Sequence, residues 1–219
     1  MPRIVDLTMT LRDGMRGVAF EPARRIEEDG WNAQTLRLYS HAGTHMDAPR
    51  HFDDAGATID RVALEKCVGP ARIVDLTPVE PREIITLDRL GRSAESIGEG
   101  DRVLLRTGWS DDPDRADYRA RFPRVGIELA RWFAERRIAL LGVDAPSVAD
   151  VNDREELTAV HRALLDGGIA IVEDLVNLGA LRKNVVMLVA LSLKVLDGDG
   201  APARVIAIEG HPRVGGSSS

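Results

Sequence analysis

The chain has 219 residues, 44% of them hydrophobic and 29% charged, which is enough for one domain whose core needs no disulfide or structural metal. Its 29 basic and 35 acidic side chains give a formal charge of -6, which argues against nucleic acid as a partner. The single cysteine, Cys67, excludes an intramolecular disulfide and favours a reducing, cytoplasmic compartment. We also expect no membrane partner, because no apolar run is long enough for a secretion signal or a membrane span.

Seven short runs rich in β-branched residues, separated by turn residues, predict strands. In chain order they comprise residues 4–7, 71–76, 102–106, 139–143, 169–172, 185–191 and 204–208. The long segment from residue 10 to residue 51 shows no clean hydrophobic period, so we expect it to be rich in loops.

Apolar residues spaced by three and four positions predict two helices, over residues 127–136 and 155–165. Asp153 and Glu156 match a capping box at the start of the second helix. Strands and helices alternate irregularly, which predicts a mixed α/β domain rather than an orderly doubly wound sheet. The sequence therefore suggests one domain over residues 1–213, followed by a flexible tail that is rich in glycine and serine, over residues 214–219.

Four potential metal ligands lie within eleven residues of the N-terminal third: His41, His45, Asp47 and His51. A glycine and a proline in this run disfavour a helix, so we expect a turn followed by extended chain. In extended chain His45 and Asp47 would share a face, and Gly43 would let the backbone fold His41 back beside them. Two imidazoles and one carboxylate leave an open coordination position and suit Zn(II), Mn(II) or Fe(II), which favours a catalytic metal over a purely structural one.

Ordinary surface or core-edge histidines are the alternative interpretation, but the density of the cluster weighs against it. Two further candidate ligands lie downstream, and the spacing leaves both undecided. His161 is on the apolar face of the predicted helix, where a buried core histidine is an equally good interpretation. Glu173 follows a predicted buried strand and is either a ligand or a surface acid at the strand end.

The run from His41 to Phe52 resembles the His-x-Gly-Thr-His-x-Asp-x-Pro-x-His signature of the bacterial cyclase family, metal-dependent hydrolases that include kynurenine formamidase and isatin hydrolase. Further similar segments cover most of the chain: residues 4–7, 106–109, 142–147 and 198–208. The resemblance implies a swivelling β/β/α domain, a mixed sheet arrangement with flanking helices. It also implies assembly as a homodimer or homotetramer.

The same resemblance assigns roles to the candidate residues. It implies that His41, His45 and Asp47 bind a first metal and that Asp47 bridges to a second one. His161 and Glu173 would complete the second site, so that each chain holds one or two ions, with Zn(II) or Mn(II) as the expected metals. His51 would serve as the proton-transfer residue.

These residues predict hydrolysis of a carbon–nitrogen bond in a small amide, formamide or lactam. A bound cation lowers the pKa of water from about 15.7 to about 7 and polarises a carbonyl group, so no serine or cysteine nucleophile is needed. His51 could take the proton of the water and return it to the leaving nitrogen. The alternatives are a cyclase or dehydratase that uses the same metal site, and a metal-binding protein without turnover.

The sequence says less about the small-molecule substrate. Phe20, Trp31, Phe52 and Trp109 could wall a pocket for a flat ring or be ordinary core residues. Asp144 and Ser147 follow a predicted strand and could hydrogen-bond the substrate or cap a turn. The run Asp197-Gly-Asp-Gly200 resembles the start of a calcium loop, but its twelfth position is Ile208 rather than Glu, which favours a turn between strands.

Overall fold

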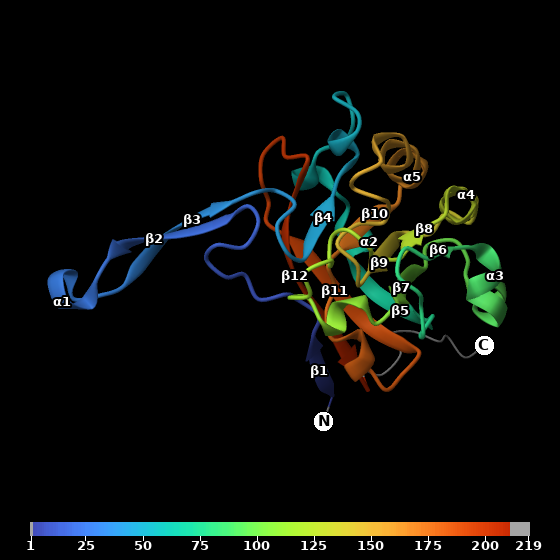
Figure 1. Ribbon diagram of the computed structural model, residues 1–219, viewed down its shortest axis with the longest axis horizontal. Coiled ribbons are helices and arrows are strands. Elements are labelled where there is room, and N and C mark those ends of the chain that lie inside the picture. The colour runs from blue at the N-terminus through green and yellow to red at the C-terminus, as the bar shows by residue number, and fades with distance from the viewer. Residues whose placement is uncertain (1, 211–219) are drawn as a thin grey trace, which may run out of the picture.

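A computed structural model describes residues 2–210, in which eight strands form one mixed sheet that closes on itself (Figure 1). The strands of this sheet are β1 (Arg3–Asp6), β4 (His45–Asp47), β5 (Val68–Asp75), β7 (Arg102–Arg106), β9 (Leu140–Val143), β10 (Ala170–Glu173), β11 (Val185–Ser192) and β12 (Gly200–Glu209). Their order is β1-β12-β11-β5-β7-β9-β10-β4, and β4 also pairs with β12, which makes the sheet barrel-like. The tail predicted for residues 214–219 lies outside the described residues.

The long strand β12 makes this closure possible. Its first three residues pair with β4, residues 206–209 pair with β1, and β11 lies along the opposite edge. The central strands β5, β7, β9 and β10 are parallel to one another, whereas the remaining pairings are antiparallel. As a result, the three-residue strand β4 lies between β10 and β12, and side chains from distant parts of the sequence meet around it.

Side chains alternate between two cores because successive residues of a strand point to opposite faces of the sheet. On β7, Leu104 belongs to the core enclosed by the sheet, whereas Val103 and Leu105 belong to the core beneath the helices. The helices that cover this outer core are α4 (Ile127–Glu135) and α5 (Arg154–Asp166). Burial on both faces explains why these strands appear in the sequence as continuous apolar runs.

The two predicted helices are confirmed, and each boundary lies within one residue of the prediction. At the start of α5 the carboxylate of Asp153 accepts hydrogen bonds from the backbone N–H groups of Glu155 and Glu156. Only this half of the predicted capping box forms, because the carboxylate of Glu156 accepts instead from the N–H of Asp150. The predicted mixed sheet with flanking helices is also confirmed.

The remaining elements in the main body are short, and the sequence analysis did not identify them: α2 (Leu64–Cys67), α3 (Leu87–Leu90), β6 (Ile84–Ile85) and β8 (Arg124–Val125). No helix among residues 2–210 is both long enough and apolar enough to cross a bilayer.

The expectation of a loop-rich segment over residues 10–51 is wrong for its central part. There, β2 (Val18–Arg24) and β3 (Ala33–Leu38) form a hairpin that carries the short helix α1 (Ile26–Asp29) near its tip. Figure 1 shows this hairpin extending away from the body of the molecule, and we call residues 18–38 the arm. The arm pairs only with itself and buries little surface, so its residues lack the apolar alternation that marks a strand on a core.

Candidate metal centre

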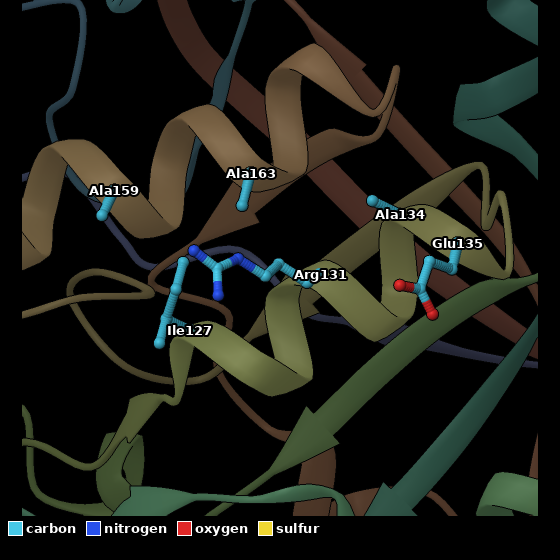
Figure 2. Close-up of a pocket in the computed structure, with 6 residues that line it drawn as sticks. All are labelled: Ile127, Arg131, Ala134, Glu135, Ala159 and Ala163. Atoms are coloured by element: carbon cyan, nitrogen blue, oxygen red, sulfur yellow. The ribbon is translucent and has the colours of Figure 1, made fainter.

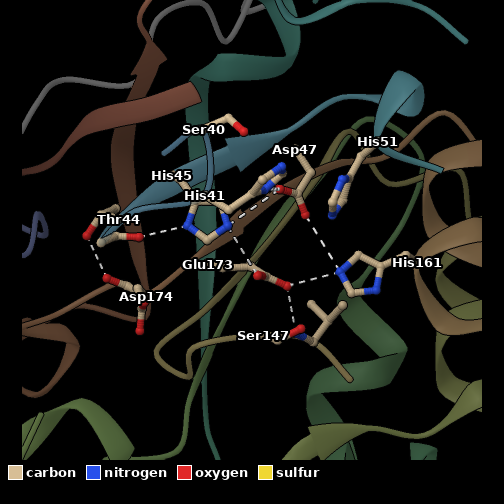
Figure 3. Close-up of polar contacts among 12 residues, drawn as sticks. Ser40, His41, Thr44, His45, Asp47, His51, Ser147, His161, Glu173 and Asp174 are labelled. Carbon is tan, nitrogen blue, oxygen red and sulfur yellow. Dashed lines mark hydrogen bonds and ion pairs between the residues drawn. The ribbon is translucent and has the colours of Figure 1, made fainter. Parts of the chain in front are cut away.

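The first three predicted ligands converge as the sequence analysis expected. His45 and Asp47 lie at alternate positions of β4 and point to one side of it, and His41 folds back beside them (Figure 3). Nδ1 of His41 lies 2.8 Å from Oδ1 of Asp47, and Nε2 of His45 lies 3.5 Å from the same oxygen. Gly43 permits the fold-back because its φ of 57° is left-handed and a Cβ there would lie 2.7 Å from Leu11.

His161 and Glu173 complete the group from the other side. Glu173 ends β10 directly opposite His45 in the antiparallel pairing, and its Oε2 lies 3.3 Å from Nε2 of His45. His161 projects from α5 with its Nε2 3.3 Å from Oε1 of Glu173 and 3.7 Å from Oδ2 of Asp47. Together the five side chains form two overlapping triads that share Asp47, and within each triad the possible ligand atoms lie within 4.8 Å of one another.

Backbone acceptors orient two of the three imidazoles. Nδ1 of His45 donates a hydrogen bond to the carbonyl of Gly43 over 2.7 Å, and Nδ1 of His161 donates to the carbonyl of Leu157 over 2.8 Å. A carbonyl can only accept, so both Nδ1 atoms carry a proton and Nε2 is the nitrogen available to a cation. This hydrogen bonding of the second ring nitrogen is typical of histidines that bind metals.

His41 has the reverse orientation and a charged partner. Its Nδ1 faces Asp47, whereas its Nε2 lies 2.8 Å from Oδ2 of Asp199. Asp199 immediately precedes β12, and the first residue of that strand, Gly200, leaves space for the ring, since a Cβ there would lie 2.8 Å from Cε1 of His41. The interpretation of residues 197–200 as a turn overlooked this carboxylate, whose partner is about 160 positions away in the sequence.

The group is suited to a divalent cation on two grounds. Oδ2 of Asp47 is buried and has no hydrogen-bond partner among the described residues, a costly arrangement that a cation would relieve. Three imidazole nitrogens and two carboxylates, without sulfur, also form a ligand set that Zn(II), Mn(II) and Fe(II) accept. The residues present therefore fit the metal that the sequence analysis anticipated.

Buried negative charge gives the group a strong attraction for positive charge. Burial alone would lower the pKa of His45, but its hydrogen bond with Glu173 and the charges of Asp47 and Glu173 raise that pKa to about 9. The pKa of His161 is likewise raised against the effect of burial, mainly by Glu173. Burial would raise the pKa of Glu173, yet its bonds with both histidines hold it well below the usual range. The same charges would favour a divalent cation, which competes with these protons.

His51 lies beside the ligand group rather than within the two triads. It ends a 3₁₀ turn over Pro49–His51 that follows β4, and its ring stacks on that of His41 with the centroids 3.9 Å apart. Its side chain is 25% exposed. Nδ1 of His51 lies 3.6 Å from Asp199, so that His41, His51 and Asp199 form a third possible ligand group. Burial lowers the pKa of His51, which favours the neutral ring that can accept a proton.

A small cavity of about 170 Å³ opens onto these residues, and Ser147 is one of those that line it together with His51 and His161. Phe52 also lies beside the group, since its ring stacks on that of His161 with the centroids 4.7 Å apart. Behind the cavity the backbone N–H of Val148 donates to Oε1 of Glu173 over 2.7 Å, which ties the Ser147 segment to the ligand group.

The other residues predicted to contact substrate lie elsewhere in the chain. Trp109 is buried in the outer core, where its Nε1 donates to the carbonyl of Tyr118, so the geometry supports the core interpretation. Asp144 accepts hydrogen bonds from the N–H groups of Thr107 and Gly108 and therefore caps a turn.

Phe20 and Trp31 belong to the arm segment, and Trp31 is 59% exposed between α1 and β3. Neither is among the residues that line the cavity at the histidines, and Figure 1 shows the arm extending away from the body of the molecule. The geometry of one chain therefore does not place Phe20 or Trp31 at this cavity.

A larger depression of about 460 Å³ lies between α4 and α5, on the outer side of the helices (Figure 2). Its lining contains alanines, Ile127, Arg131 and Glu135 but none of the candidate ligands. It offers no pair of acid and base aimed at a common point, so the candidate site is the smaller cavity at the histidines.

Comparisons with known proteins are consistent with this geometry. The family model named Cyclase matches residues 5–150. A kynurenine formamidase of Salinibacter ruber is 41% identical over 189 residues, which covers 84% of each protein. Isatin hydrolase A of Labrenzia aggregata, solved with benzyl benzoate, superposes with a TM-score of 0.80 at 27% identity and covers 94% of this chain and 93% of its own. A potential metal-dependent hydrolase with cyclase activity superposes with a TM-score of 0.80 at 29% identity, over 97% of this chain and 100% of its own.

Proposed function

The chain belongs to the Cyclase family, and on that premise we propose that it is a metal-dependent hydrolase that cleaves the carbon–nitrogen bond of a small amide, formamide or lactam. The observation that carries the proposal is the pair of triads that share Asp47, whose Oδ2 is buried without a partner among the described residues. On this proposal the enzyme acts on non-peptide amides. Its relatives named above include a kynurenine formamidase and an isatin hydrolase.

The proposed division of labour follows the two triads. His41, His45 and Asp47 would hold one divalent cation, and Asp47, His161 and Glu173 would hold a second where two are bound. Zn(II) and Mn(II) are the proposed metals, because both accept nitrogen and carboxylate ligands together. When bound, such a cation supplies Lewis acidity, which makes water nucleophilic near neutral pH and stabilises negative charge on a carbonyl oxygen.

The protein side chains supply proton transfer and orientation. His51 stands at the edge of the cavity, and its lowered pKa favours the neutral ring. We propose that this ring takes a proton from water and then returns it to the departing nitrogen. Asp199 holds Nε2 of His41 and lies near Nδ1 of His51, so it positions both rings. Ser147 lines the same cavity and is the proposed polar contact for the substrate.

Removal of the metal tests the proposal directly. We expect the purified protein to contain at least about half an equivalent of Zn or Mn, and chelation to abolish hydrolysis of N-formylkynurenine or isatin while circular dichroism stays largely unchanged. Restoring Zn(II) or Mn(II) should restore turnover. Loss of the fold on chelation would instead indicate a structural metal, and a ring-closed or dehydrated product would indicate cyclase or dehydratase chemistry.

We propose that the arm pairs the chain into a homodimer, which can associate further into a homotetramer. The arm exposes large apolar side chains that one chain leaves uncovered: Ile26 at 60%, Trp31 at 59% and Leu36 at 54% exposure. Burying them on a second copy would remove apolar surface from water and could bring Phe20 or Trp31 near the cavity of that copy.

Light scattering should therefore give the mass of at least two chains for the unmodified protein. The double variant Ile26→Glu and Trp31→Glu should shift the measured mass toward that of a monomer, because a charge in a buried apolar contact is costly. Glu27→Gln with Glu28→Gln, on the same short helix, is the control that should keep the assembly. A monomeric unmodified protein would contradict the proposal.

Two further expectations remain proposals. The buried free thiol of Cys67 is compatible with a reducing, cytoplasmic compartment. The assignment of residues 1–213 to one domain stays a prediction.

A further inference from the structure

Two arginines, Arg16 and Arg119, line both the small cavity at the histidines and a larger cavity beside it. The larger cavity measures about 360 Å³ and lies between the N-terminal loop and the loop over residues 113–119. Both arginines line both cavities, and so does His41, which means that the two spaces adjoin. A molecule held at the histidines therefore lies next to both arginines.

No carboxylate in the described part of the chain forms a close ion pair with either arginine, although burial raises the pKa of the nearby Asp174 and the charge of Arg119 partly opposes that rise. Neither guanidinium forms an ion pair or a side-chain hydrogen bond with any residue from 2 to 210. The Arg16 guanidinium lies over the ring of Tyr39, whose centroid is 5.4 Å away. Arg16 is exposed and Arg119 is half-buried, so both can reach a ligand.

The other two arginines of the larger cavity behave differently. Arg12 forms an ion pair with Asp114 at 2.5 Å. Arg115 pairs with Asp117 at 2.7 Å and stacks over the ring of Trp109. The charges of Arg12 and Arg115 are thus paired with carboxylates of the protein itself.

The carboxylates that line the larger cavity are also already engaged. Arg12 pairs with Asp114, and the hydroxyl of Tyr118 donates to Asp174 over 2.8 Å. Neither is paired with Arg16 or Arg119. Arg16 and Arg119 line both cavities, and the hydrogen-bond donors of their guanidinium groups are not engaged by any of these carboxylates.

We propose that Arg16 and Arg119 bind a carboxylate group of the substrate while the amide of that substrate lies at the histidine cluster. The proposal rests on the proposed hydrolase function and narrows its substrate class to amides that carry a carboxylate. A guanidinium presents parallel N–H donors that match the two oxygens of a carboxylate, and such charge-assisted bonds are among the strongest in proteins. Met9, Met15 and Pro113 in the larger cavity would contact the apolar part of the substrate.

The test compares nearly isosteric substrates that differ in the charge of one group, with the metal-loaded enzyme. Formamidobenzoates and the corresponding neutral formamidobenzamides present the same formamide with and without a carboxylate, and release of formate reports cleavage of that formamide alone. We expect kcat/KM to favour the carboxylate by at least about 10-fold, mainly through KM, because each hydrogen bond to a charged group carries that order of discrimination. Arg16→Gln and Arg119→Gln should each reduce this preference about 10-fold, mainly by raising KM for the carboxylate substrate, whereas the Lys variants should retain part of it.

Arg12→Gln is the matched control, because Arg12 lines the same cavity but is neutralised by Asp114. It should keep the preference of the unmodified enzyme. A second readout does not depend on catalysis: benzoate should bind the chelated protein in calorimetry, and more weakly to the Arg16 and Arg119 variants.

The outcomes separate this proposal from the function on which it rests. Hydrolysis of both substrates without preference, or benzoate binding that is absent or equal in all variants, would overturn the carboxylate site and leave the hydrolase function standing. No hydrolysis of any amide by the metal-loaded enzyme would contradict the function, whereas the binding measurement would still report on the arginines.

Discussion

Replacing Asp47 by asparagine is expected to lower kcat/KM for amide hydrolysis by more than about 100-fold, because even residues that only orient a metal ligand typically cost 10–100-fold. Asp47 serves both triads: its Oδ1 lies near His41 and His45, and its Oδ2 faces His161. An amide keeps one of these oxygens but loses the negative charge that attracts a cation. Elemental analysis of the purified variant should accordingly show less than half of the metal of the unmodified protein.

Asp144→Asn is the matched control for this experiment. Asp144 is as buried as Asp47, with 1% exposure for each, and it also stands at the end of a strand of the sheet. Its carboxylate, however, accepts from Thr107 and Gly108 and faces no candidate ligand. We expect this variant to lose about 1–3 kcal/mol of folding free energy and to keep its metal. Full metal content in Asp47→Asn would refute the shared role of Asp47.

His51→Ala is expected to keep the metal and to lose about 10²- to 10⁴-fold in kcat, the range that general acid–base catalysis contributes. The ring of His51 stacks on His41 but lies outside the two triads that share Asp47, so its removal should take away proton transfer rather than a ligand. Steady-state kinetics and metal analysis on one preparation measure both quantities, and KM should change little.

Added imidazole provides the control for His51→Ala. Because the truncation leaves space at the edge of the cavity, imidazole in solution should restore part of kcat in the variant and leave the unmodified enzyme unaffected. A loss of metal in proportion to the loss of activity would contradict the role of His51 in proton transfer. His51 would then be a ligand, as its grouping with His41 and Asp199 allows.

The regular elements of the body were predictable because their signals are local. Strands such as residues 102–106 are buried on both faces, and α4 and α5 each bury one stripe, so burial leaves a period in the sequence. The arm was missed because a hairpin that contacts the rest of its chain only near its base buries no stripe of side chains and so has no such period.

By itself the sequence determined the first half of the site. His41, His45 and Asp47 are brought together by a turn at Gly43 and three residues of extended chain, and both features depend on residues only a few positions apart. The dense spacing of ligands was therefore sufficient to predict this triad.

Residue spacing left the rest of the candidate site undecided; the family resemblance implied it, and the tertiary structure brings its side chains together. His161 and Glu173 could have been a core histidine and a surface acid, and they face Asp47 because β10 pairs with β4 while α5 packs outside the sheet. Asp199 lies in a run that the sequence predicted to be a turn, and no sequence signal marked Arg119. Their positions follow from closure of the sheet and from loops packed over its edge, and such long-range contacts depend on the whole fold rather than on neighbouring residues.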